Sequence, residues 1–223
     1  MLPTASRLAG AVLACWAIRG GAAEAASCAP AKDPTIVVTA SAAPIRDDRS
    51  RSIADLTRRM AGQGPEGPAL GLTYSRVGTE ISYAIRAVPS GDGYCVTFDR
   101  IDAAITLNLI VYLAAELKPG NCIDGEAKRH EQKHVALERK MLPVAKARVE
   151  KALAGVAKRT ATGASVEAAG DKLQRAARQA VDQVLTAFAA EKKAEQLKFD
   201  TIEEYQKLSQ ACSADEIRRL LNP

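Results

Sequence analysis

The chain has 223 residues, of which 47% are apolar and 4% are aromatic, and its formal net charge is +5. This length is sufficient for one sizeable core, and the abundant alanine with few aromatic residues indicates helices packed through small side chains. The positive charge, concentrated in the C-terminal half, favours solubility or contact with an anionic envelope surface. A nucleic-acid partner is not expected, because no aromatic residues alternate with the basic ones.

Residues 1–25 have the pattern of a cleaved export signal. Arg7 supplies positive charge, Leu8–Ile18 is a short apolar run, and Ala23–Ala25 offers small residues for cleavage. The run of about 11 apolar residues is too short to span a bilayer, which takes about 20. We therefore expect a secreted or periplasmic protein with one domain over residues 26–223, and an uncleaved anchor is the alternative.

Four cysteines lie beyond this signal: Cys28, Cys95, Cys122 and Cys212. An even number in an oxidising compartment predicts two disulfides, and four cysteines allow three pairings. We favour Cys95 with Cys122 and Cys28 with Cys212, because the first bond would link a strand to the loop before the first long helix. Zinc binding by thiolates is not expected, because the chain has no C-x-x-C pair.

Residues 33–118 have the pattern of a small antiparallel sheet with one short helix. The β-branched run Thr35–Thr39 predicts the first strand. Ser52 begins a helix over residues 53–60, in which Asp55 completes a capping box, and a turn around Pro65 ends it. Three strand-like segments follow, at residues 70–77, at residues 80–88 after which Ser90–Gly93 forms a turn, and at residues 94–113 with a break near residue 102.

From residue 124 to residue 223 the pattern is helical. A long helix is predicted over residues 124–159 with a kink at Pro143, and then a loop over residues 160–165. A second long helix follows over residues 166–197, with an apolar stripe that includes Ala187 and Phe188. Ser213 caps a last helix over residues 214–221. We therefore predict an α+β fold in which a sheet precedes a long helical hairpin.

The only two histidines, His130 and His134, stand four residues apart in the sequence His-Glu-Gln-Lys-His. This H-E-x-x-H spacing places both imidazoles on one face of a helix, where they can occupy two corners of a tetrahedral zinc site. Glu131 then lies beside the metal and can act as general base on a zinc-activated water. The alternatives are zinc binding without turnover, or a solvated lysine-rich helix whose histidines share a face by chance.

A catalytic zinc needs a third protein ligand, and this chain has no third histidine. An antiparallel helical hairpin would bring the acidic C-terminal stretch towards the motif. We place Asp200 first among the candidates, which are Glu191, Glu195, Asp200, Glu203, Glu204 and Tyr205. Glu126 and Glu138 share the histidine face and are candidates to orient the ligands. The positive charge of Lys128, Arg129 and Lys133 opposes cation binding unless these side chains point to solvent.

With these residues the chain resembles a bacterial family of predicted secreted zinc-dependent proteases, which is formally a domain of unknown function. The resemblance covers about residues 35–145 and, more weakly, the C-terminal part. It depends on the early strand and helix with the following Gly64-Pro65, the strand pair from Leu72 to Tyr83, Cys95, and the H-E-x-x-H motif.

The resemblance implies a zincin-like metallopeptidase acting on a protein or peptide substrate, with zinc on His130 and His134 and with Glu131 as general base. The family has an aromatic-Asp pair, matched by Phe199-Asp200, and a later histidine whose place is taken by Tyr205. A zinc-free pseudoenzyme therefore remains an alternative. The other alternative is a non-catalytic envelope protein whose helical hairpin binds a partner.

Overall fold

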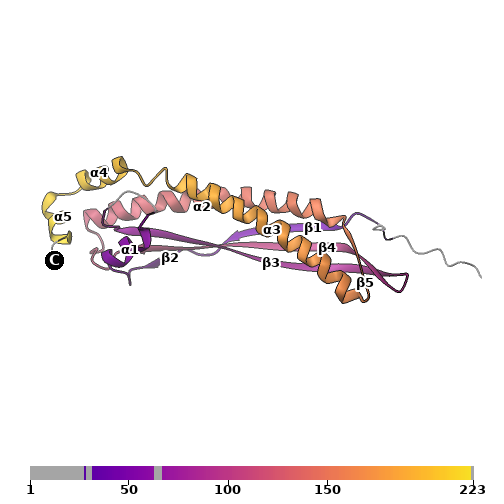
Figure 1. Cartoon of the computed structure of the whole chain (residues 1–223). Coiled ribbons are helices and arrows are strands. Elements are labelled where there is room, and N and C mark those ends of the chain that lie inside the picture. Colours follow the sequence, from indigo (N-terminus) through magenta and orange to yellow (C-terminus); the bar gives the residue numbers. More distant parts are fainter. Residues whose placement is uncertain (1–27, 29–31, 63–66, 222–223) are drawn as a thin grey trace, which may run out of the picture.

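The structure is a computed structural model that describes residues 28, 32–62 and 67–221. The predicted export signal, residues 1–25, and the predicted turn at Gly64-Pro65 lie outside the described residues. The described chain is an elongated α+β fold in which two long helices run along one face of a sheet (Figure 1). The α+β prediction is therefore confirmed.

The sheet is built on a long hairpin of β3 (Gly71–Ser90) and β4 (Gly93–Leu113). The predicted turn between them is confirmed, and Gly91 adopts φ 58° there, which glycine tolerates best. The predicted breaks within this region are wrong. Gly78 pairs with Thr106 and Asp102 pairs with Ser82, so the backbone ladder continues through both positions.

The prediction of a purely antiparallel sheet is also wrong, because the sheet is mixed. On the edge of β4 opposite β3, β1 (Thr35–Ala42) and β2 (Arg46–Asp48) pair parallel to β4. The predicted loop over residues 160–165 contains β5 (Thr160–Gly163), which pairs antiparallel with the start of β4. Three short strands thus share the second edge of β4, and β4 is the central strand.

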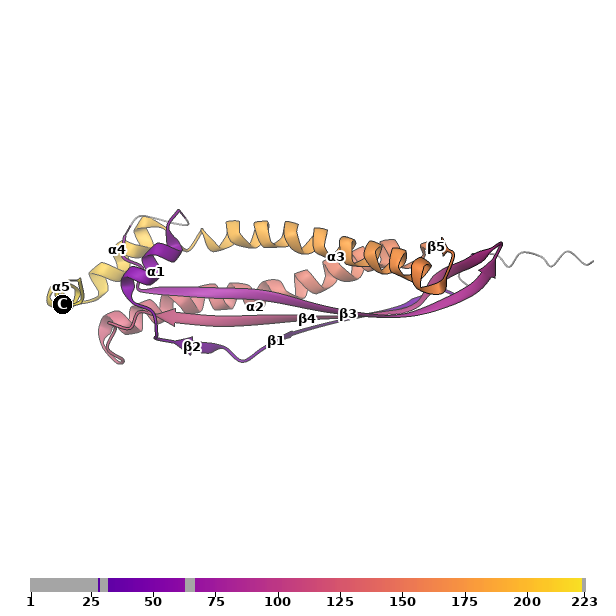
Figure 2. The same ribbon diagram turned by 60° about the horizontal axis from the view of Figure 1, so that its bottom comes forward.

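The helices α2 (Cys122–Ala157) and α3 (Val166–Gln196) cover one face of the sheet (Figure 2). Both agree with the predicted helices to within about two residues, and α2 continues through Pro143. Alternate residues of β4 point towards these helices and form the core with small and branched side chains. The main contributors are Phe98, Ile101, Ile105, Val149, Leu153, Leu173, Ala177 and Val181. In the predicted stripe of α3, Phe188 is buried but Ala187 is exposed.

Short helices gather at the end of the molecule where β4 ends and α2 begins. The predicted helix α1 (Ile53–Met60) is confirmed with its capping box: Asp55 N–H donates to Ser52 Oγ at 3.1 Å and Ser52 N–H donates to Asp55 Oδ2 at 3.4 Å. The predicted α5 (Ala214–Leu221) is present, and α4 (Ile202–Ala211), which was not predicted, precedes it.

The two disulfides are Cys28–Cys95 and Cys122–Cys212, so the favoured pairing is wrong. Cys95 lies at the start of β4, whereas Cys122 follows the end of this 21-residue strand. A strand of this length spans about 70 Å at 3.3 Å per residue, which separates the two cysteines too far for a bond. Two disulfides indicate an oxidising compartment.

Among the described residues, no helix is long and apolar enough to cross a bilayer.

The core between α2 and the sheet provides a test of the fold. Leu153 on α2 is fully buried, whereas Val144 on the same helix is 41% exposed. We expect Leu153→Ala to lower the free energy of unfolding by about 2–5 kcal/mol, because it removes packed atoms and leaves a cavity. Val144→Ala should change it by at most about 0.5 kcal/mol. Denaturant unfolding of both variants measures the difference, and equal effects would contradict this core.

Candidate metal centre

The two histidines of the motif face the end of α3. His130 is 8% exposed and His134 is 7% exposed, and both belong to the face of α2 that contacts the rest of the protein. Because α3 runs back along α2, the connection between α3 and α4 reaches these histidines. It places the Asp200 side chain, 9% exposed, against both imidazoles. The third residue is thus about 70 positions away in sequence but adjacent in space.

Three ligand atoms converge at this point. The Nε2 atoms of His130 and His134 are 3.1 Å apart, and each lies 3.1 Å from Oδ1 of Asp200. The ligand atoms of a tetrahedral zinc ion bonded at about 2.0 Å are about 3.3 Å apart, so the spacing fits such an ion. Two imidazole nitrogens and a carboxylate oxygen are also a common zinc donor set. The group can therefore hold a metal ion.

The electrostatics of the group keep Asp200 negative. Burial disfavours its ionised form, but the hydrogen bonds with His130 and His134 outweigh burial and lower the pKa of Asp200 to about 2. Burial also opposes protonation of His134, yet its contact with Asp200 and the charge of Glu131 raise the pKa of this imidazole above its usual value. A carboxylate that is ionised at neutral pH beside two imidazoles suits a divalent cation.

Glu131 is 4% exposed and lies between α2 and the first residues of β3. The hydroxyl of Thr73 donates a hydrogen bond of 2.7 Å to its Oε2 atom. Gly71 leaves room for the carboxylate, because a Cβ atom there would lie 2.6 Å from Oε1. Burial raises the pKa of Glu131, and the positive field of His134 and the Thr73 hydrogen bond offset only part of this rise. A raised pKa makes the carboxylate a stronger base.

A chain of hydrogen bonds orients His134 through Nδ1, the ring nitrogen that does not face Asp200. Its Nδ1 atom is in contact with Oε1 of Gln196, and an amide oxygen can only accept, so Nδ1 is the donor. Nε2 can then carry a second proton and donate to the ionised Asp200, in agreement with the raised pKa of this ring, or, in the neutral ring, offer its lone pair to a metal ion. The Gln196 amide donates to Glu138 at 3.0 Å, and Lys192 also donates to Glu138 at 3.0 Å.

The two predicted orienting carboxylates therefore have different positions. Glu138 acts on His134 indirectly, through Gln196, whereas Glu126 pairs with Arg129 on the exposed side of α2. Sequence reasoning missed Gln196. The available signal was its position, because Gln196 is at the end of α3 and stands only four residues before Asp200.

The positive residues of the motif region point away from the ligand atoms. Lys133 pairs with Glu204 of α4, and its side chain is 45% exposed. Lys128 and Arg129 are also exposed and pair with Asp47 and Glu126. Their charge is therefore screened by solvent and by partners, and it does not prevent a cation from binding.

The other candidate carboxylates are not part of this group of converging ligand atoms. Tyr205 lines the same cavity, with its ring centroid 6.0 Å from that of His130. Burial, followed by the negative charges of Asp200 and Glu131, raises the pKa of Tyr205 to about 12, so the phenol keeps its proton at neutral pH. Three of the carboxylates have basic partners instead, Glu191 with Arg148, Glu195 with Lys198 and Glu204 with Lys133, and Glu203 is exposed.

A cavity of about 180 Å³ opens over this group of residues. Its wall includes His130, Glu131, His134 and Asp200, together with the apolar side chains of Met60, Leu72 and Leu197. The site therefore combines ligand atoms, a buried base and space for a reacting group.

A second cluster of residues of metal-binding types consists of Cys122, Cys212 and Glu216. It is not a metal site in this structure, because its two sulfur atoms are bonded to each other.

Comparisons of the chain with protein-family models, with curated proteins and with solved structures found no match. The assignment of a function therefore depends on the residues of the site and their geometry.

The hydrogen bond between His134 Nδ1 and Gln196 leads to a prediction about zinc affinity. We expect Gln196→Ala to weaken zinc binding about 10–100-fold, because the imidazole loses the acceptor that fixes its tautomer and orientation. Gln183→Ala is the matched control, since Gln183 is an exposed glutamine on the same helix. Competition with a chromophoric zinc chelator measures both affinities. Equal affinities in the two variants would rule out the orienting role of Gln196.

Proposed function

We propose that the protein is a secreted or periplasmic zinc-dependent peptidase. In this proposal His130, His134 and Asp200 hold the zinc ion, and Glu131 is the general base. The observation that supports it most directly is the convergence of three ligand atoms at mutual distances of 3.1 Å beside the buried carboxylate of Glu131. The two disulfides agree with an exported protein, because such bonds persist in oxidising compartments.

Zinc bound by these residues supplies Lewis acidity, which acidifies a water molecule and polarises the scissile carbonyl. The protein's own contribution is proton transfer and orientation. Glu131 accepts the proton that the attacking water loses, and the same carboxyl group returns it to the leaving amine nitrogen when the C–N bond breaks. Its burial favours the first step, because the raised pKa makes proton uptake easier, and the hydrogen bond from Thr73 fixes Oε2 for both steps.

The position of β3 favours an extended peptide as substrate. Gly71, Leu72, Thr73 and Ser75, all at the start of β3, line the cavity. Within the part of the chain that the structure describes, β3 pairs with β4 alone, so its other edge has no strand partner. Such an edge binds extended chains through backbone hydrogen bonds. A peptide bound there would run past the ligand atoms.

The roles of the motif residues can be separated by substitution. Glu131→Gln should leave zinc bound but reduce hydrolysis by at least about 100-fold, because an amide cannot accept the proton. His130→Ala should lose both the zinc and the activity. Glu150→Gln is the control, since Glu150 is an exposed carboxylate on the same helix. Incubation of each purified protein with a peptide mixture, followed by mass spectrometry of new termini, measures hydrolysis.

Metal analysis of the purified protein must accompany this assay, because two histidines and one carboxylate also suit Fe²⁺. One equivalent of zinc per chain, lost in His130→Ala, is the expected result. Equal hydrolysis by Glu131→Gln and the unsubstituted protein would eliminate the general-base role. Stoichiometric zinc with no cleavage of any peptide would favour a non-catalytic metal-binding protein of the envelope.

A substitution at Gly71 tests the position of Glu131 without changing the chemistry of its carboxylate. The Cβ atom of Gly71→Ala would lie 2.6 Å from Glu131 Oε1, so the flexible end of that side chain must move. We expect zinc binding to persist and turnover to fall at least about tenfold, because a displaced base transfers protons poorly. Gly78→Ala on the same strand is the control, since its nearest atom would be 3.9 Å away. Equal turnover in both variants would contradict this geometry.

A further inference from the structure

The segment that contains Asp200 and Tyr205, residues 197–221, makes little use of hydrophobic burial. It includes α4 and α5. Among the residues of these two helices whose exposure the structure describes, none is fully buried. Cys212, Ile217 and Leu220 pack only partly buried against the core cluster at this end of the molecule. Elements with so few buried apolar contacts open locally at low free-energy cost.

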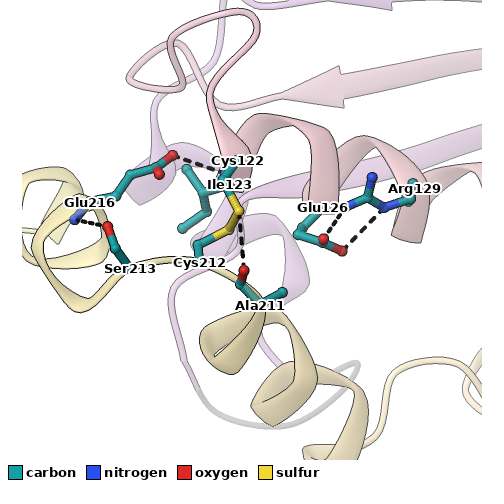
Figure 3. The surroundings of a disulfide bond; sticks show 8 residues. All are labelled: Cys122, Ile123, Glu126, Arg129, Ala211, Cys212, Ser213 and Glu216. Carbon is teal, nitrogen blue, oxygen red and sulfur yellow. Dashed lines mark hydrogen bonds and ion pairs between the residues drawn. A yellow bond between two sulfur atoms is a disulfide. The ribbon is translucent and has the colours of Figure 1, made fainter.

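A disulfide attaches this segment to the helix of the motif. Cys212 lies between α4 and α5 and is bonded to Cys122, the first residue of α2 (Figure 3). Two further contacts surround the bond: the backbone N–H of Ile123 donates to Glu216 at 3.0 Å, and Glu216 N–H donates to Ser213 Oγ at 3.3 Å. Of these contacts, the Cys122–Cys212 bond and the Ile123–Glu216 hydrogen bond join the segment to α2, and the disulfide is the covalent one.

The metal centre lies between two anchors of the chain. Before Asp200, Gln196 contacts His134. After it, Glu204 forms a partly exposed ion pair with Lys133, a weak type of attachment, and Cys212 is covalently bonded to Cys122. Cys122 stands eight residues before His130 on α2, a distance of about 12 Å along the helix axis. The chain between the anchors therefore crosses the ligand atoms, and its second anchor limits how far Asp200 can move away from the two imidazoles.

We propose that the Cys122–Cys212 disulfide is a redox-sensitive clamp on the metal centre, so that its reduction releases α4 and α5 and weakens zinc binding. This inference rests on the proposed zinc site. With the bond intact, the Asp200 carboxylate is presented to the ion at high effective concentration. With the bond broken, zinc binding must also order the released segment, and the cost of that ordering lowers the affinity.

The two disulfides differ in their access to a reductant. Cys122 is exposed and Cys212 is half-buried, whereas in the other disulfide Cys28 is half-buried and Cys95 is 1% exposed, so only the Cys122–Cys212 bond has an exposed cysteine. Reduction requires direct attack on a sulfur atom, so the Cys122–Cys212 bond reacts first. A dithiol protein would be oxidised to its disulfide as the Cys122–Cys212 bond breaks, and its two thiol protons would end on the two cysteine sulfurs.

The test compares two double variants of the full mature chain. We expect Cys122→Ser with Cys212→Ser to raise the zinc dissociation constant at least about tenfold. Cys28→Ser with Cys95→Ser is the matched control, and it should leave the constant within about twofold, because that disulfide lies at the opposite end of β4. Chelator competition measures the constants, and circular dichroism verifies that both variants are folded.

The outcomes separate this inference from the proposed function. If the unsubstituted protein binds no zinc, the proposed function fails. If it binds zinc but the Cys122/Cys212 variant binds equally well, or if both double variants weaken binding to the same extent, only the clamp is overturned.

A second measurement avoids the variants, should either fail to fold. The unsubstituted protein is reduced mildly with a water-soluble phosphine, which is oxidised to its oxide with oxygen from water as the two thiols form, and is then alkylated with iodoacetamide. Alkylation prevents the freed thiols from binding metal. We expect faster amide hydrogen exchange in residues 197–221 and unchanged exchange in the α2–α3 core. Unchanged exchange in residues 197–221 would overturn the clamp.

Discussion

The candidate metal centre depends on how α3 returns along α2. The two helices pack through small buried residues such as Ala145 and Ala177, and both also contact the face of the β3–β4 hairpin. This packing determines the axial position of one helix relative to the other. A shift of one helical turn would displace the end of α3 by about 5.4 Å, which exceeds the 3.1 Å spacing of the ligand atoms. The core of the long hairpin therefore positions Asp200 even though it lies outside the site.

The site requires polar groups to be buried on a helix whose other inward residues are mainly apolar. His130, Glu131, His134 and Glu138 are each at most 8% exposed. Burial of such groups is unfavourable unless each has a partner, and most of these partners come from other elements. Thr73 of β3 contacts Glu131, and Lys192 of α3 contacts Glu138. The same contacts that offset burial also orient the groups, so the stability of this end and the geometry of the site are coupled.

The molecule is elongated, and the candidate site lies at one end of it, away from the apolar core in the middle. At one end, where α4 and α5 lie (Figure 1), residues of α2, β3, α3 and α4 line the cavity, and the Cys122–Cys212 bond joins α2 to the residue between α4 and α5. At the other end, β5 and the buried Cys95 close the tip of the sheet. The middle of the molecule is an apolar core between sheet and helices. Changes at the site end can therefore alter ligand geometry while the core remains packed.

Sequence alone determined the features that depend on interactions within about one helical turn or between alternate residues. The capping box at Ser52, the limits of α2 and α3, and the common face of His130 and His134 are of this kind, because each depends on residues at most four positions apart.

Contacts between distant segments required the tertiary structure. Sequence included Asp200 among six candidates, and only the return of α3 along α2 brought it to the imidazoles, 66 and 70 residues away in sequence. The contact of Gln196 with His134, the pairing of β3 with β4 through Gly78 and Asp102, the parallel pairing of β1 and the disulfide partners were likewise decided in three dimensions. The physical reason is that helix propensity and residue alternation are local properties, whereas register and proximity arise only when the core packs.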